Sequence, residues 1–163
     1  TPSSDTDVLP KRLDSPSQRS IDGKATPLSL SRPASTLTIA YAISITKDSP
    51  YLDGAIVLGH AIKLAHEKSQ FKYALVAFVH PEVFDAREQL AFLGWRVLVR
   101  EVPVVVSSIR GEYLRTHIKA NGCCGERELL KLWTYTLIEY HRIVHLDMDS
   151  LVLEPMDELF DDE

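Results

Sequence analysis

From residue 37 onward, apolar and polar positions follow two alternating patterns. Runs rich in β-branched and apolar residues predict buried strands over 37–45, 72–79, 95–99 and 142–146. Between them, apolar residues recur at helical spacing and predict helices over 50–68, 81–93 and 126–141. Residues 103–125 follow neither pattern clearly, so we predict a loop there, with room for a short helix over 111–120. Strands that alternate with helices are typical of an α/β fold with a mostly parallel sheet and helices on both faces.

Residues 1–36 have a different composition. They are rich in Ser, Pro, Thr and Asp, they lack apolar periodicity, and their opposite charges nearly cancel. Such a segment cannot bury enough apolar surface to fold, so we expect a disordered leader or linker, followed by one folded unit over 37–163. The chain begins at Thr1 rather than Met and ends at Glu163, soon after its strongest motif. We therefore expect a fragment of a longer protein, truncated at its C-terminus.

The overall composition excludes several classes of protein. A chain of 163 residues that is 45% hydrophobic and 25% charged matches an average globular domain, not a collagen or a coiled coil. The net charge of −5 provides no sequence-wide attraction for nucleic acid. The two cysteines, Cys123 and Cys124, are adjacent and too few for a disulfide framework or a structural zinc site. No apolar run approaches the length of a transmembrane helix.

The segment with the clearest chemistry contains two acids directly after the last predicted strand. Asp147 and Asp149 follow the apolar run 142–146, and open α/β sheets bind ligands at the carboxyl ends of their strands. In extended backbone the two side chains share one side and repel each other, a cost that a divalent cation converts into ligation. Carboxylates, water and diphosphate oxygens are the usual ligands of such a cation. From position alone, a metal site and a pair of solvated turn acids remain alternatives.

Several segments of the chain match one family in the right order: 44–59, 128–137, 140–149, 151–153 and 156–160. Together they resemble glycosyltransferase family 8, the glycogenin-like group, over about residues 37–163. The resemblance implies a GT-A fold, of which this chain would be the N-terminal, nucleotide-sugar-binding part. It also implies transfer of a hexosyl group from a UDP-sugar to an unknown acceptor, with retention at the anomeric carbon. The cofactor would be Mn²⁺ or Mg²⁺.

The resemblance also implies roles for individual residues. Asp149 would ligate the metal most directly, Asp147 would contact the metal and the ribose, and Met148 would offer backbone contacts to the nucleotide. Lys131 would meet the diphosphate as a point charge. The uridine would be held by the segment after the first strand, at Ile45, Thr46, Lys47, Asp48 and Tyr51. Lys47 and Asp48 depart from the Thr or Asn that the family often has, and no residue is identified as a catalytic nucleophile.

Other chemically active side chains have simpler interpretations. We expect His145 to be a packed core histidine, and His60 and His66 to lie on a helix surface. Cys123 and Cys124 are most simply loop residues. Glu126 and Glu128 are explained as first-turn acids that interact favourably with the helix dipole.

Two alternatives to a glycosyltransferase stay open at this point. A phosphatase of the haloacid dehalogenase type also carries Asp-x-Asp at a strand end, although its motif continues differently from Ser150-Leu151. The other alternative is a non-catalytic module that binds a nucleotide sugar. It stays open because the family's later metal-binding His and Gly/Lys segment are not in this sequence. The acceptor could be a glycan, a protein or a small molecule, and no nucleic-acid partner is expected. The resemblance fits the Golgi lumen, with a membrane anchor outside this sequence, as well as the cytoplasm.

Overall fold

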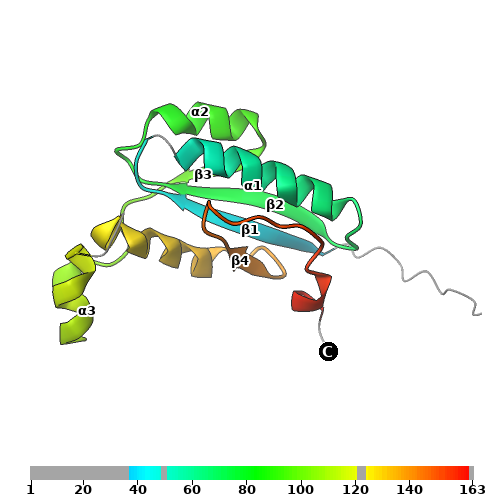
Figure 1. The fold of residues 1–163 in the computed structure, drawn as a ribbon. Coiled ribbons are helices and arrows are strands. Elements are labelled where there is room, and N and C mark those ends of the chain that lie inside the picture. Colours follow the sequence, from blue (N-terminus) through cyan, green and yellow to red (C-terminus); the bar gives the residue numbers. More distant parts are fainter. Residues whose placement is uncertain (1–36, 49–50, 121–123, 162–163) are drawn as a thin grey trace, which may run out of the picture. The chain divides into compact units, whose positions relative to one another are not determined.

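The core of the fold is a parallel sheet built around one apolar strand. The computed structural model describes residues 37–48, 51–120 and 124–161, all within the unit Pro33–Glu163. Strand β1 (Thr38–Ile45) pairs with β2 (Lys72–Val79) on one side and with β4 (Ile143–His145) on the other. Strand β3 (Trp95–Val99) extends the sheet beyond β2, so the order is β3-β2-β1-β4. The predicted α/β fold with a parallel sheet is confirmed (Figure 1).

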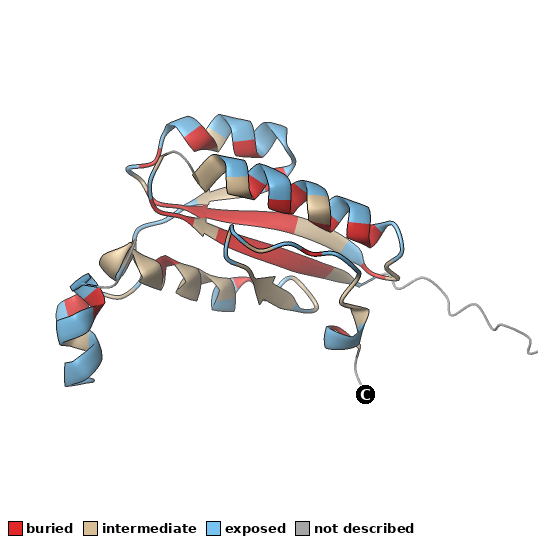
Figure 2. Ribbon diagram, viewed as in Figure 1, coloured by how far each residue is buried: buried red, intermediate tan, exposed pale blue. Residues whose placement is uncertain are grey.

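Helices cover both faces of this sheet, as predicted (Figure 1). Helices α1 (Tyr51–His66) and α2 (Asp85–Phe92) pack on one face, and the 3₁₀ helix η3 (Gly125–Thr136) packs on the other. The strand period of two separates the faces, because Ile39 and Ile43 join the core under α1 whereas Ala40 and Ala42 join the core under η3. Figure 2 shows the buried residues concentrated on the central strands and on the side of α1 that faces them.

Most predicted elements match the structure, and the differences lie at the ends of helices and strands. Strands β2 and β3 have the predicted boundaries, while β1, β4 and α1 are shorter than predicted by one or two residues at an end. Helix α2 begins at Asp85 rather than at residue 81, because the carboxylate of Asp48 accepts hydrogen bonds from the backbone N–H groups of Phe84, Asp85 and Ala86. The predicted leader over 1–36 lies outside the described residues, as does Ser49-Pro50.

One predicted boundary after β3 was wrong. Helix η3 ends at Thr136 rather than at residue 141, since Leu137 turns into the core and the N–H of His141 already donates to the carbonyl of Thr38 in β1. The region 103–125 is not a loop throughout, and the short helix for which the sequence left room over 111–120 is confirmed. The region contains η1 (Val106–Ser108), α3 (Glu112–His117) and η2 (Ile118–Ala120).

The chain after β4 runs back along the sheet and is anchored at its far end. Val152 and Phe160 are buried in the same core as α1. The carboxylate of Asp157, in η4 (Asp157–Leu159), accepts hydrogen bonds from the hydroxyl of Ser69 at 2.6 Å and from the N–H of Gln70 at 2.9 Å. The acids at 147 and 149 are therefore held between β4 and a fixed downstream segment.

One histidine of α1 is buried, contrary to the sequence analysis. His60 is exposed as predicted, but His66 packs against Tyr41 and Tyr73 and bonds to the Tyr41 hydroxyl at 2.9 Å. The periodicity of α1 could not reveal this, because these tyrosines come from neighbouring strands. None of the helices in the described ranges is both long and apolar enough to cross a lipid bilayer.

Candidate functional site

A cavity of about 630 Å³ lies at the carboxyl ends of β1 and β4. Its walls come from the end of β1, the start of α1, the first half of η3 and the segment after β4. Six residues that the sequence analysis assigned to the site line it: Thr46, Tyr51, Lys131, Asp147, Met148 and Asp149. These residues are far apart in the chain, and the parallel sheet brings them to one place.

The other three assigned residues do not line this cavity. Ile45 is fully buried in the core under α1. Lys47 is exposed, outside the cavity wall. The carboxylate of Asp48 accepts the three backbone hydrogen bonds at the start of α2, so its role here is that of a helix cap.

Asp147 and Asp149 lie on a turn that directly continues β4. The N–H of Leu146 still bonds to Ala42 of β1 at 2.9 Å, and the N–H of Ser150 then closes the turn onto the carbonyl of Asp147 at 3.0 Å. Both acids are exposed and line the cavity. Their position is set by the end of the sheet, where ligands of open α/β folds bind.

The donor set of this turn fits a hard divalent cation. Among the described residues, no group of three or more His, Cys, Asp and Glu side chains is arranged as a complete metal site. Two carboxylates at the mouth of a cavity leave most coordination positions to water and to a phosphorylated ligand, which is the arrangement that Mg²⁺ and similar ions favour. Asp147 and Asp149 are the residues that would hold such an ion.

Lys131 approaches the same space from η3 and is paired with Glu128. Its Nζ lies 2.6 Å from the Glu128 carboxylate, three residues earlier, where side chains of a 3₁₀ helix are eclipsed. The hydrogen bond to Glu128 raises the pKa of Lys131, and the nearby Asp147 contributes in the same direction. The ammonium is therefore charged, and it lines the same cavity as Asp147 and Asp149.

The cavity wall also contains a neutral polar pair between two strands. Nε2 of His145, in β4, lies 2.9 Å from Oγ of Ser44, in β1. Burial lowers the pKa of His145, so the imidazole is uncharged near neutral pH. We expected a core histidine, whereas the structure places it half-buried in the wall of the cavity.

Sequence reasoning missed several residues of the cavity wall, which are Ser44, Cys124, Arg127, Glu128 and His145. Cys124 accepts a hydrogen bond from the hydroxyl of Thr46 at 3.3 Å, whereas Cys123 lies outside the described residues. One signal was available for His145, because strand alternation puts it on the same side as Asp147. The same alternation applied to Ser44 in β1, whereas Cys124, Arg127 and Glu128 come from a loop and from the first turn of η3, where no comparable signal was present in the sequence.

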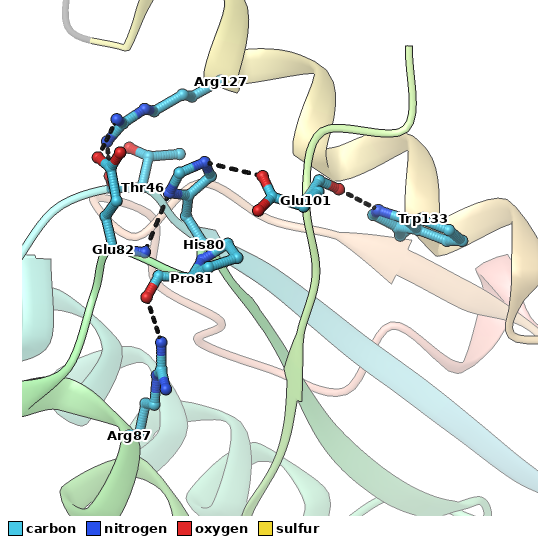
Figure 3. Close-up of polar contacts among 8 residues, drawn as sticks. All are labelled: Thr46, His80, Pro81, Glu82, Arg87, Glu101, Arg127 and Trp133. Carbon is cyan, nitrogen blue, oxygen red and sulfur yellow. Dashed lines mark hydrogen bonds and ion pairs between the residues drawn. The ribbon is translucent and has the colours of Figure 1, made fainter. Parts of the chain in front are cut away.

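A polar network continues from the cavity along the carboxyl edge of the sheet (Figure 3). Arg127 donates to the carbonyl of Thr46 at 3.0 Å and forms an ion pair with Glu82. The N–H of Glu82 donates to Nδ1 of His80, whose Nε2 lies 3.7 Å from the carboxylate of Glu101. This network connects η3 to the segments that follow β1, β2 and β3.

Comparison with known proteins agrees with the sequence resemblance. No protein-family model matches the chain. Galactinol synthase 2 of Arabidopsis thaliana is 29% identical over 124 residues, which cover 75% of this chain and 33% of that protein. Glycogenin-1 of Homo sapiens is 29% identical over 121 residues, which cover 74% of this chain and 32% of that protein. The chain thus spans about a third of the length of the curated relatives it matches.

These matches and the sheet agree with one another. The fold is an α/β fold of the GT-A type. The chain is related to the glycogenin-like glycosyltransferases of family 8, and the resemblance stated from the sequence is confirmed.

Proposed function

We propose that this chain is the donor-binding part of a retaining glycosyltransferase that transfers a hexosyl group from a UDP-sugar to an acceptor. The observation that carries the proposal is the cavity in which Asp147, Asp149, Lys131 and Tyr51 meet, in a chain related to glycosyltransferases. A volume of about 630 Å³ is within the range of sites that enclose small molecules.

The charges of the cavity support a requirement for a divalent cation. Three carboxylates line it, from Glu128, Asp147 and Asp149, against two cationic side chains. Lys131 is paired with Glu128, and the other cation, Arg127, is paired with Glu82. A diphosphate entering this space alone would meet a surplus of negative charge, which a divalent cation between it and the aspartates removes.

Each residue then has a role in binding the donor. Asp149 and Asp147 hold Mn²⁺ or Mg²⁺, which when bound neutralises the charge of the departing diphosphate. Lys131 donates to a phosphate oxygen as a point charge. The half-buried Tyr51, at the start of α1, offers a ring on which uracil can stack, and Thr46 lines the same cavity.

Calorimetry on the full-length protein tests this function. UDP should bind with Mn²⁺ and lose its affinity when EDTA is added. Asp149→Asn should weaken UDP binding by at least ~1.5–3 kcal/mol, since a charged ligand group is lost. Asp85→Asn, at the exposed start of α2, is the matched control and should leave binding unchanged. Equal UDP affinity with Mn²⁺ and with EDTA would contradict the proposal.

A further inference from the structure

The side chains of η3 lie in rows along the helix. A 3₁₀ helix has three residues per turn, so side chains three positions apart lie above one another. Arg127, Leu130 and Trp133 form one row of η3, and Glu128 and Lys131 belong to the next. A rotation of the helix by one residue, about 120°, would turn the first row away from the sheet and bring a neighbouring row into its place.

The first row attaches η3 to the sheet at three points. Leu130 is fully buried in the core beneath η3. Arg127 donates to the carbonyl of Thr46 at the end of β1, at 3.0 Å. Trp133 donates from Nε1 to the carbonyl of Glu101 after β3, at 2.8 Å (Figure 3). The burial of Leu130 alone does not define the rotation of the helix, because apolar contacts are non-directional, whereas hydrogen bonds are directional.

Arg127 makes the more extensive of the two polar attachments. One arm of its guanidinium donates to the Thr46 carbonyl, and the other pairs with the carboxylate of Glu82. A guanidinium holds such a two-armed arrangement rigidly, and a lysine ammonium does not reproduce it. Arg127 is also four residues before Lys131, in the part of η3 that lines the cavity.

We propose that Arg127 is a positioning residue that fixes the rotation of η3 and thereby directs Lys131 toward the acid pair. The placement of Lys131 follows from the contacts of this chain alone. Its consequence, tighter binding of a diphosphate, rests on the function proposed above. In this proposal Arg127 acts through Lys131, since both ends of its guanidinium are held by Thr46 and Glu82; the double mutant below distinguishes this from a direct contact through its remaining N–H donors.

Two readouts on the full-length protein test this inference. The first is the ¹⁵N-lysine NMR signal of the Lys131 ammonium, assigned by its loss in Lys131→Arg. The shift of this signal on Asp147→Asn reports how near the ammonium lies to the acid pair, whereas the bond to Glu128 lies within one row of η3 and turns with the helix. That shift should shrink in Arg127→Met, and Arg127→Lys should not restore it. The second is the affinity for UDP and for uridine, with Mn²⁺ present. Arg127→Met should weaken UDP about tenfold, as expected for one charge-assisted hydrogen bond, and leave uridine nearly unchanged.

A double mutant separates positioning from direct contact. If Arg127 acts through Lys131, Lys131→Ala should add little to the loss of UDP affinity in Arg127→Met, because the two changes remove one interaction. Additive losses would mean that Arg127 contacts the diphosphate itself, and would overturn the proposal. Equal weakening of UDP and uridine would also overturn it, since that result indicates a general structural role.

Two further outcomes are also decisive. If Arg127→Met does not fold by circular dichroism, Glu82→Gln takes its place. That variant removes only the ion pair, and it should likewise reduce the effect of Asp147→Asn on the Lys131 signal. If the wild-type protein binds no UDP, the proposed function fails, but the NMR signal still decides whether Arg127 places Lys131. If Asp147→Asn shifts the Lys131 signal as much in a folded Arg127→Met protein as in the wild type, the inference is refuted.

Discussion

Gly54 of α1 lies directly against the backbone of Met148, the residue between the two aspartates. A Cβ atom at position 54 would come within 2.6 Å of the Met148 carbonyl oxygen. This separation is shorter than any real Cβ contact, and the opposing atom is backbone, so it cannot rotate away. The glycine therefore lets helix and turn approach closely enough to define the position of the acid pair.

Gly54→Ala should displace the acid turn and weaken Mn²⁺ binding. We expect a loss of about 1–3 kcal/mol in the free energy of unfolding, the usual cost of inserting a methyl group into a packed site. Thermal melting and calorimetric titration with Mn²⁺ measure the two effects. Gly111→Ala is the control, because a Cβ there meets nothing within 4 Å. If both variants bind Mn²⁺ like the wild type, the close approach does not position the acids.

Lys131→Ala should weaken binding of UDP about tenfold while affecting uridine little, because only UDP carries the diphosphate that an ammonium can contact. Titration of both ligands in the presence of Mn²⁺ measures the ratio. The exposed Lys63, in the last turn of α1, provides the matched control Lys63→Ala. Equal effects on the two ligands would assign Lys131 a structural role.

Asp48→Ala should destabilise the fold rather than abolish nucleotide binding. The substitution removes the acceptor of three backbone hydrogen bonds at the start of α2, which costs about 1–2 kcal/mol for a helix cap. Urea unfolding measures the loss, with Asp53→Ala in the first turn of α1 as the control. A normal unfolding midpoint combined with a large loss of UDP affinity would instead support the role that the family resemblance implies for Asp48.

Stability should decrease as the pH falls below about 6.5. Burial lowers the pKa of His66 in the folded protein, so the unfolded chain takes up this proton first. The neutral His66 ring therefore contributes its full stabilisation above the pKa that this histidine has in the unfolded chain. The contribution is lost progressively as the pH falls below that value. Burial lowers the pKa of His145 too, with the same sign.

Chemical unfolding across pH 5 to 8 measures this dependence. His66→Gln should flatten the profile in part, and His66→Gln combined with His145→Gln should flatten it further. The exposed His60→Gln serves as the control. A wild-type profile that is flat over this range, or that rises toward acid, would show that the two buried rings do not resist protonation.

The sequence by itself determined the sheet and the location of the chemistry. Strand and helix periods are local properties, so the runs at 37–45, 72–79 and 95–99 could be recognised without knowledge of their partners. The acid pair could be located because it follows a strand directly, and parallel strands present their carboxyl ends at one edge of the sheet. The family resemblance added the roles of Lys131 and Asp149, which stay predictions.

Only the tertiary structure decided which other side chains meet in the cavity. Ser44 and His145 are 101 residues apart, and Arg127 contacts Thr46 across 81 residues. Asp48 lies among the residues assigned to the nucleotide, but its carboxylate binds the start of α2. A sequence period specifies which face of an element a side chain occupies, whereas its hydrogen-bond partner depends on how elements distant in the chain are packed together.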